Sequence, residues 1–237
     1  MKKPFPLLVF SLVLLYAPTL SAQLPSSTRS KEAIIRVRPQ FQSQLRAKKL
    51  TYGSAIFMRI FKESKELEVW IKQEDIFEHF KNYNICTYGS EGLGPKVRQG
   101  DGKAPEGFYV VTPKEMNPLS NFHLSFNLGY PNEYDKAHKR TGSALMVHGN
   151  CVSIGCYAMT DAGIEEIYAL ADAALRNGQQ FFKVHIFPFR MTVEHMEKYS
   201  KSEWIDFWRN LKVGYDYFER MHIPPSVRVR NKRYVFE

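Results

Sequence analysis

The segment 144–159 constrains the fold more than any other part of the chain. It reads as an apolar strand, a loop that opens with His148, a turn that ends in Cys156, and a helix start at 160–161. A fold that keeps this order places an imidazole and two thiols between a strand end and a helix N-terminus. The sequence therefore points to cysteine chemistry at this place.

Such a position suits a thiolate nucleophile. A cysteine with its ordinary pKa near 8.5 is only a few per cent ionised at neutral pH, so Cys156 needs help to react. The imidazole of His148 can take its proton, and the positive end of the following helix favours the anion. Gly155 lets the backbone turn sharply and exposes amides to a developing oxyanion. On spacing alone, a buried packing cysteine beside a structural histidine stays open as the alternative.

The same residues resemble a known active-site signature. His148-Gly149 followed by Ser153-x-Gly155-Cys156 is similar to the signature of the L,D-transpeptidase catalytic domain, also called the YkuD domain. The longer string HGNCVSIGCYAM resembles the YafK branch of murein L,D-transpeptidases, which includes the DpaA-type hydrolases. Further segments that resemble this branch follow in the same order: 93–96, 99–101, 104–109, 187–192 and 214–219. The resemblance thus runs from about residue 50 to near the C-terminus.

One position departs from the broader superfamily. Many members carry His where this chain has Ile154, and they place the His-Gly pair farther from the cysteine. A mechanism that uses a second imidazole there does not carry over to this chain.

The resemblance implies a fold of the α+β class that is mainly β. We expect an L,D-transpeptidase-type β-sandwich or open barrel, with a helix after the catalytic loop and a C-terminal helical extension. The predicted organisation is a signal peptide over 1–22, a flexible basic segment over 23–50, a catalytic domain over 51–190, and a helical and hairpin extension over 191–237 that packs on it.

The resemblance also implies roles within the motif. Cys156 is the expected nucleophile and His148 the general base, while backbone amides around Gly155 and Tyr157 form the expected oxyanion hole. Ser153 either orients His148 or caps the turn. The expected reaction passes through a thioester at the L-centre of diaminopimelate in a peptidoglycan stem peptide. It requires neither a cofactor nor a metal.

Three cations are candidates for binding a substrate carboxylate. Lys96 and Arg98 lie in a loop over 89–107 that is rich in Gly, Pro and charge. Arg190 follows the strand predicted over 181–187. For each of the three, the alternative is an ordinary solvated side chain.

The acceptor of the thioester stays open. If water accepts the acyl group, the enzyme hydrolyses the bond between peptidoglycan and a Braun-type lipoprotein, as the resemblance to DpaA-type hydrolases implies. If an amine accepts it, the enzyme is an L,D-transpeptidase that forms 3-3 cross-links or attaches lipoprotein. A third interpretation is a non-catalytic cell-wall-binding module. A papain-like protease is set aside, because its cysteine precedes a distant histidine.

Residues 1–22 have the features of a secretory signal peptide: Lys2 and Lys3, a short apolar run, and a small-residue cleavage site. The run is short for a bilayer span, so we expect no stable membrane insertion after cleavage. The family then implies the periplasm. The net charge of +9, or +7 without the two lysines (31 basic minus 24 acidic), favours a polyanionic partner. No nucleic-acid-binding signature is present in the sequence, so the expected partners are peptidoglycan stem peptides and peptidoglycan-linked outer-membrane lipoprotein.

The three cysteines limit the disulfide pattern. In an oxidising compartment at least one of them stays unpaired within a monomer. If Cys156 is the nucleophile it must stay a thiol, and Cys86 and Cys151 are free to pair with each other. Such a disulfide would tie the loop after His148 to the sheet. Three free thiols would refute this hypothesis.

Apolar patterns place the remaining elements. A short helix is expected over 39–49, and aromatic residues at helical spacing over 204–218 are interpreted as packing rather than as sugar-stacking groups. His123 and His185 fall on the polar phase of their strands, so both are expected to be exposed. The run 76–85 has partly helical spacing, but the resemblance favours a strand. The full set comprises strands over 56–61, 67–71, 76–85, 107–111, 123–128 and 181–187, a helix from 160–161 to 177–178, and a terminal hairpin over 226–230 and 233–236.

Overall fold

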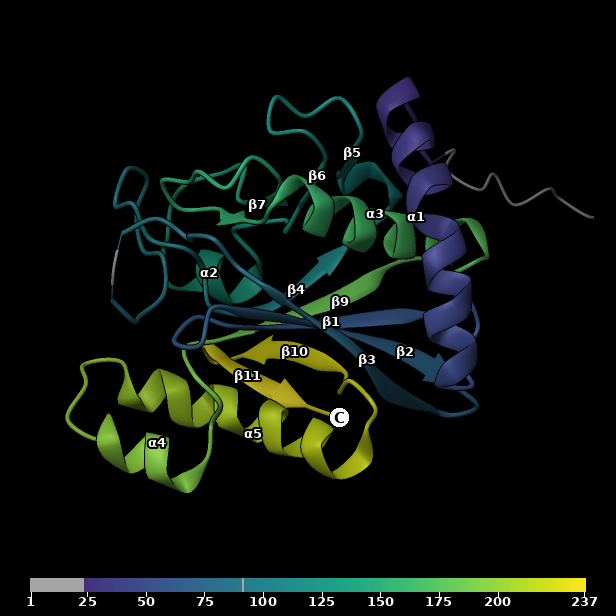
Figure 1. Ribbon diagram of the computed structural model, residues 1–237. Helices are drawn as coiled ribbons and strands as arrows, with labels where there is room; N and C mark the ends of the chain where they lie inside the picture. The colour runs from purple at the N-terminus through teal and green to yellow at the C-terminus, as the bar shows by residue number, and fades with distance from the viewer. Residues whose placement is uncertain (1–23, 91) are drawn as a thin grey trace, which may run out of the picture.

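The computed structural model describes residues 24–90 and 92–237, which form a mixed α+β structure (Figure 1). The predicted signal peptide, 1–22, lies outside the described residues. The strands form two main sheets and a terminal hairpin, and in this described part of the chain neither main sheet closes into a barrel. The predicted α+β class with an open sheet architecture is confirmed.

The larger sheet has five strands. Their order in space is β3 (Ile76–Asn84), β2 (Glu66–Gln73), β1 (Ile56–Phe61), β9 (Phe182–Phe187) and β4 (Gly107–Val111). The β1–β9 pair is parallel, and the other pairs are antiparallel. Every residue of β1 is buried, because helices cover both faces of the sheet (Figure 1). The strand predicted over 76–85 is confirmed as β3.

The smaller sheet has four short strands: β5 (Met116–Asn117), β6 (Ser125–Asn127), β7 (Met146–His148) and β8 (Tyr157–Ala158). The 3-10 turn η1 (Pro113–Glu115) precedes it, and the short helix α2 (Glu133–Ala137) lies between β6 and β7. The strand predicted over 123–128 is therefore shorter than expected. His123 is half-buried rather than exposed, since its Nε2 lies 2.8 Å from Glu165 Oε1.

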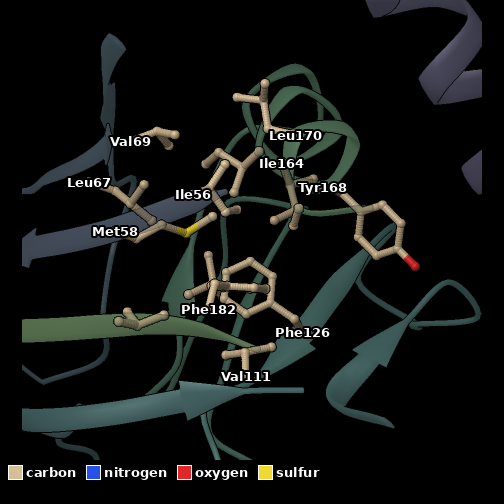
Figure 2. Packing of buried hydrophobic residues seen from close by; sticks show 14 of the residues in the cluster. Ile56, Met58, Leu67, Val69, Val111, Phe126, Ile164, Tyr168, Leu170 and Phe182 are labelled. Carbon is tan, nitrogen blue, oxygen red and sulfur yellow. The ribbon is translucent and has the colours of Figure 1, made fainter. Parts of the chain in front are cut away.

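The main core lies between the two sheets and helix α3 (Asp161–Arg176). Figure 2 shows Ile164 of α3 near Ile56 of β1, with Phe126 of β6 and Phe182 of β9 packed below them. The rings of Phe126 and Phe182 meet edge to face with centroids 5.4 Å apart. Thr160 caps α3 as predicted, since its Oγ1 accepts a hydrogen bond from Gly163 N at 3.1 Å. The core thus fixes the start of the helix that follows Cys156.

The N-terminal segment corrects one expectation. Helix α1 spans Thr28–Ala47, where a flexible segment with a short helix over 39–49 was expected. Its buried positions, Ala33, Val37, Phe41 and Leu45, recur every four residues and pack toward α3 (Figure 1). The three larger side chains each stabilise by about 1.5–3 kcal/mol when buried. Together they exceed the roughly 3 kcal/mol that a proline costs inside a helix, so Pro39 does not break α1.

The C-terminal residues cover the other face of the larger sheet. Helices α4 (Val193–Lys198) and α5 (Ile205–Met221) and the hairpin of β10 (Val227–Arg230) and β11 (Arg233–Phe236) lie there (Figure 1). Phe207, Trp208, Leu211, Tyr215 and Phe218 are buried, and most of them cluster with aromatic side chains of β1, β4 and β9. The aromatic spacing in this region therefore reflects packing, as interpreted from the sequence.

A buried ion pair between Lys62 and Glu106 links the larger sheet to the C-terminal residues. Lys62 Nζ lies 2.9 Å from Glu106 Oε1, and both side chains are fully buried. Trp208 Nε1 of α5 donates to Glu106 Oε2 at 2.8 Å. Gly94 completes the network, because its N–H donates to Glu106 Oε1 at 2.9 Å and its carbonyl accepts from Lys62 Nζ at 2.7 Å. Burial lowers the pKa of Lys62, while Glu106 opposes that shift. We call Lys62, Gly94, Glu106 and Trp208 the charge network.

His185 is buried, although the sequence pattern predicted exposure. Its side chain is 1% exposed and meets the rings of Phe57 and Phe108 edge to face, at 4.6 and 4.7 Å between centroids. The prediction failed because alternation in β9 assumes one solvated face. The C-terminal residues cover that face, so both phases of the strand are buried.

Candidate active site

His148 ends strand β7 and is 1% exposed. Its Nδ1 lies 2.6 Å from the carbonyl oxygen of Gly149. A carbonyl only accepts, so Nδ1 carries the proton and Nε2 is left with its lone pair. The ring also packs on Phe122, with centroids 4.6 Å apart. Burial lowers the pKa of His148, and the Gly149 carbonyl partly offsets this shift. The imidazole is thus held as a neutral base.

Cys156 directly precedes β8, the strand that pairs with β7. β7 and β8 are parallel, with Val147 opposite Tyr157, so the register continued by one residue places Cys156 opposite Met146. Met146 and His148 point to one face, because side chains alternate along a strand. The Cα atoms of Cys156 and His148 are then about 6.6 Å apart along the strands and ~4.8 Å across, or roughly 8 Å in total. This register brings thiol and imidazole to a separation that side chains can bridge.

The thiol contacts the backbone of the strand that leads to His148. Its Sγ accepts from Met146 N at 3.4 Å and donates to the Ala144 carbonyl at 3.6 Å. Among the described residues, no hydrogen bond joins the thiol to the ring of His148. Burial raises the pKa of Cys156, while the Met146 amide and the charge of Lys96 oppose the shift. The resting pair is therefore a neutral thiol and a neutral imidazole.

Ser153 binds the turn rather than His148. Its Oγ accepts from the amides of Gly155 and Cys156, at 3.0 and 2.6 Å, and donates to the Cys156 carbonyl at 2.7 Å. The serine hydroxyl thus holds two amides of the expected oxyanion hole in the resting structure. Tyr157 belongs to the β7–β8 ladder, and its buried side chain donates to the Pro105 carbonyl at 2.7 Å. Of the two roles considered for Ser153, the geometry favours the cap.

Two glycines allow close approaches around this turn. A Cβ on Gly149 would lie 2.6 Å from Asp161 Oδ1, an oxygen that also accepts from Asn150 N at 2.7 Å. A Cβ on Gly89, where φ is +97°, would lie 2.6 Å from Gly155 N. Larger residues would push apart the backbone segments that enclose Cys156. The turn over residues 153–156, which we call the nucleophile turn after the proposed role of Cys156, is therefore packed closely against neighbouring segments of the chain.

A disulfide joins the site to the larger sheet. Cys86 follows β3 and is bonded to Cys151, with 5.3 Å between their Cα atoms and a sequence separation of 65. Cys86 N also donates to the Ala158 carbonyl at 2.8 Å. Cys156 is the free cysteine of the chain. The loop between His148 and Cys156 is therefore anchored in its middle, and its second thiol cannot compete with Cys156.

The three candidate cations are placed differently. Lys96 is buried close enough to influence the Cys156 charge, and its Nζ lies 2.7 Å from Asp101 Oδ1. Arg98 is exposed on the same loop. Arg190 lies away from the thiol, over the ring of Phe61, and pairs with Glu66 and Glu68 at 2.8 Å each. Arg190 was expected to bind a substrate carboxylate. Its guanidinium is already paired with two carboxylates of the protein.

A groove of about 650 Å³ opens over the segment whose backbone contacts the thiol, and neither Cys156 nor His148 is among its lining residues. Its lining includes Ala144 and Met146, whose backbone groups contact Cys156 Sγ, and also Tyr130, Pro131 and Lys136. Ligand sites are commonly concave and of this size. We call it the thiol groove.

Sequence reasoning missed several residues that support the site. The sequence indicated Asp161 only as part of a helix start, but its Oδ1 also accepts a hydrogen bond from Asn150 N in the loop after His148. The pairing of Lys96 with Asp101 was also missed. Despite some burial, Lys96 and three backbone amides lower the pKa of Asp101 to about 2. The run Lys96-x-x-x-x-Asp101, closed by glycines on both sides, is a signal for such a loop clamp.

Other expectations concern metals and membranes. Among the described residues, no three His, Cys, Asp or Glu side chains gather in a way that would hold a metal ion. Within 24–90 and 92–237, no helix combines the length and the apolar character needed to cross a bilayer. Ile154, which stands where many superfamily members have His, is 92% exposed in the nucleophile turn.

Solved structures match this chain at low identity. A variant of Pgp2, the helical cell shape determining protein of Campylobacter jejuni, matches with a TM-score of 0.47 and 18% identity. That match covers 69% of this chain and 56% of the other. Bd1075 of Bdellovibrio bacteriovorus matches with a TM-score of 0.41 and 20% identity, over 75% of this chain and 78% of the other.

Sequence comparison gives the stronger relationship. The chain is 49% identical over 183 residues to YafK of Escherichia coli strain K12, which carries the name of an L,D-transpeptidase. The match covers 77% of this chain and 74% of that protein. The L,D-transpeptidase catalytic domain, YkuD, matches residues 58–186, which include His148 and Cys156. This chain belongs to the YkuD family of L,D-transpeptidase catalytic domains.

Proposed function

We propose that this protein is a periplasmic, peptidoglycan-modifying cysteine enzyme that hydrolyses the bond between peptidoglycan and a Braun-type lipoprotein. The observation that carries the proposal is the contact of the Cys156 thiol with the backbone of Ala144 and Met146, two residues of the segment that leads to His148 and lines the thiol groove. A non-catalytic wall-binding module would not require a neutral imidazole whose free nitrogen is fixed by a backbone contact.

The first step is proton transfer from the thiol to the base. Nε2 of His148 takes the proton of Cys156 as substrate enters, and the thiolate attacks the carbonyl at the L-centre of diaminopimelate. Both groups rest in their neutral forms, so the transfer separates charge inside a partly buried site. The positive charge of Lys96 favours the thiolate that forms. General-base assistance of this kind contributes about 10²–10⁴ in rate.

The second step requires amides that are occupied in the resting structure. The tetrahedral oxyanion takes the N–H groups of Gly155 and Cys156 from Ser153 Oγ. An oxyanion accepts more strongly than a hydroxyl, so the exchange favours the intermediate. The C–N bond then breaks, the leaving amine receives the proton from His148, and a thioester remains on Cys156. Water activated by His148 hydrolyses the thioester and regenerates the thiol.

The alternative acceptor is an amine. If an amine of a second stem peptide or of lipoprotein attacks the thioester, the product is a 3-3 cross-link or a lipoprotein attachment. Membership of the L,D-transpeptidase family is consistent with this outcome. Hydrolysis stays the first choice because of the specific resemblance of HGNCVSIGCYAM to the branch that includes the DpaA-type hydrolases.

One digestion distinguishes the two outcomes. Sacculi with covalently linked lipoprotein are incubated with the purified protein and with Cys156→Ala. Release of lipoprotein by the parent alone supports hydrolysis, and new 3-3 cross-linked muropeptides support transfer. Intact mass analysis after incubation with stem peptides should reveal an acyl adduct on Cys156. If neither product nor adduct forms, the proposed function is wrong.

Export is tested separately. We propose that residues 1–22 are removed and that the mature chain acts in the periplasm. The mature protein from a periplasmic extract should begin near Gln23 when its N-terminal peptide is identified by mass spectrometry. Retention of Met1 in the cell-envelope fraction would contradict cleavage.

A further inference from the structure

A second hollow of about 320 Å³ lies on the far side of the segment that borders the thiol groove. It is enclosed by strands β4 and β9, the connection after β6, helix α2 and the C-terminal hairpin. Nothing in the proposed chemistry uses it. We call it the hairpin hollow, and its volume is in the range of small-ligand sites.

The hairpin hollow contains a cation with no carboxylate partner. Lys183 Nζ donates to the carbonyls of Pro224 and Pro225, at 3.1 and 2.7 Å, and forms no ion pair within the described residues. Its amine is partly desolvated, which lowers its pKa. Lys136 lies at the rim, likewise without an ion pair in the described part of the chain, and Glu133 also lies at the rim. The two lysines outnumber the single carboxylate, so the hollow favours an anion.

A buried histidine beside the hollow has an unused polar atom. His185 is one of the lining residues and is 1% exposed. Its Nδ1 is enclosed and has no hydrogen-bond partner in 24–90 and 92–237. A buried polar atom without a partner costs roughly 1–3 kcal/mol. The unpartnered atom lies behind the wall of the hollow, so a ligand would reach it only after a shift of the surrounding side chains.

The other walls suit a peptide. Phe108, Val227, Val229 and Tyr234 supply apolar surface, and β4 is the edge strand of its sheet. Asn132 Nδ2 donates to the Phe108 carbonyl at 3.0 Å, so a side-chain amide already caps part of this edge. Apolar walls beside a strand edge match the mixed character of a peptide backbone with its side chains.

The hairpin hollow and the thiol groove have a common wall. Gly129, Pro131 and Lys136 line both. A chain that enters the thiol groove can therefore continue over Pro131 into the hollow. Because the two hollows are contiguous, the occupant we infer is the substrate that the proposed function brings to Cys156.

We propose that the hairpin hollow is a remote substrate subsite, in which Lys183 and Lys136 bind a carboxylate of the peptide part of the substrate, away from the amide that Cys156 attacks. This inference rests on the proposed function for the identity of the ligand. The subsite assigns the C-terminal hairpin a part in substrate selection.

The test measures binding rather than turnover. In the Cys156→Ala protein, the dissociation constant for a soluble muropeptide that carries the lipoprotein-derived lysine is measured by calorimetry. Lys183→Met removes the charge but keeps most of the side chain, and Val229→Trp fills the hollow without changing its charge. We expect each to weaken binding about tenfold or more. Lys183→Arg, which keeps the charge, should recover most of the affinity.

The matched control is Arg230→Ala. This substitution removes a positive charge from the same strand as Val229, on the exposed face that alternation turns away from the hollow. Its affinity should equal that of the parent. Melting temperatures identify any variant that has lost its fold, and Lys183→Met and Val229→Trp act through different contacts.

The outcomes separate this inference from the proposed function. Binding by Lys183→Met and Val229→Trp at parental affinity overturns the subsite, as does a parent that does not bind the muropeptide. If the sacculus digestion shows neither hydrolysis nor transfer while the two variants still weaken binding, the function is wrong and the subsite stands. If the parent shows turnover and both variants bind with parental affinity, the proposed function stands and the subsite is wrong.

Discussion

The two sheets divide the work of the molecule. Strands of the larger sheet run to nine residues, and its central strand is buried on both faces. The strands of the smaller sheet have only two or three residues. His148 ends one of them, and Cys156 directly precedes another. The long ladders and their packing stabilise the fold. The short ones hold the turn that ends in Cys156 with local hydrogen bonds, so the proposed chemistry would lie where regular structure is least extensive.

The two regions also treat charge in opposite ways. The charge network in the larger sheet buries a lysine and a glutamate as ions with all their partners in place. In the smaller sheet, burial favours the neutral forms of both His148 and Cys156. The scaffold thus pairs opposite charges, whereas the proposed mechanism would create charge at the site only when substrate reacts. The predictions below test this contrast.

The largest expected effect is on activity. Cys156→Ala should reduce turnover by at least about 10⁴-fold, since loss of a nucleophile removes covalent catalysis as a whole. Its free energy of unfolding should change by less than about 1 kcal/mol, because the thiol makes only weak contacts. Product analysis and urea unfolding measure the two effects. Residual activity above a tenth of the parent would contradict the assignment of the nucleophile.

The next largest effect is on stability. Glu106→Gln should lower the free energy of unfolding by about 3–5 kcal/mol, because Lys62 loses its counter-ion and must either stay charged or give up its proton in a buried site. The double variant Lys62→Met with Glu106→Gln should recover much of that loss, since no buried charge remains. Urea unfolding of both proteins measures the difference. Equal stability of the single and double variants would show that the ions are not coupled.

A smaller effect is expected at the nucleophile turn. Ser153→Ala removes a hydroxyl that binds two amides and one carbonyl. Stability should fall by about 1 kcal/mol, as for loss of a helix cap, and kcat should fall about tenfold because the turn is less ordered. Ser153→Thr keeps the hydroxyl and is the matched control. A faster enzyme after Ser153→Ala would show that the serine inhibits the resting site.

The remaining predictions concern pH, where the protein itself is left unchanged. Alkylation of Cys156 by iodoacetamide should accelerate about tenfold per pH unit from pH 6 to 8, because the raised pKa of the thiol leaves little thiolate. The rate of turnover should rise through a pKa below 6.5, that of His148. Alkylation that is already maximal at pH 6 would indicate a preformed ion pair instead.

The free energy of unfolding should also depend on pH through His148. The unfolded chain binds a proton near pH 6.5 and the folded chain only at lower pH, so between these values the unfolded state holds more protons. His148 therefore leaves stability intact above pH 6.5 and lowers it as the pH falls toward the folded-state pKa. His148→Gln should reduce this dependence in urea unfolding between pH 5 and 7.

Local patterns predicted local structure well. The strand pair β1–β2, the capped helix α3 and the terminal hairpin follow from alternation, a Thr cap and turn residues within short windows. The aromatic spacing of α5 correctly indicated a packing face.

Long-range contacts decided what the sequence did not predict. Helix α1 was expected to be flexible because charges dominate its composition, yet its four-residue stripe meets α3, more than a hundred residues away in sequence. The burial of His185 and the ion pairs of Arg190 were not predicted for the same reason. They depend on Phe57, Phe108, Glu66 and Glu68, none of which is local in sequence. Residue periodicity describes one element, and these positions depend on the elements that cover it.

The charge network has a consequence for protein engineering. A recombinant fragment that stops at Arg190 would match the family domain, but it would lack the indole that donates to Glu106 and would leave Phe61, Phe108 and Phe187 open to water. The loop over residues 89–107 is held at Gly94 by the charge network, and at Gly89 it lies against the backbone of Gly155. Without Trp208 this loop would lose a support. Shortening the gene to its recognisable domain would therefore yield an aggregation-prone product rather than a minimal enzyme.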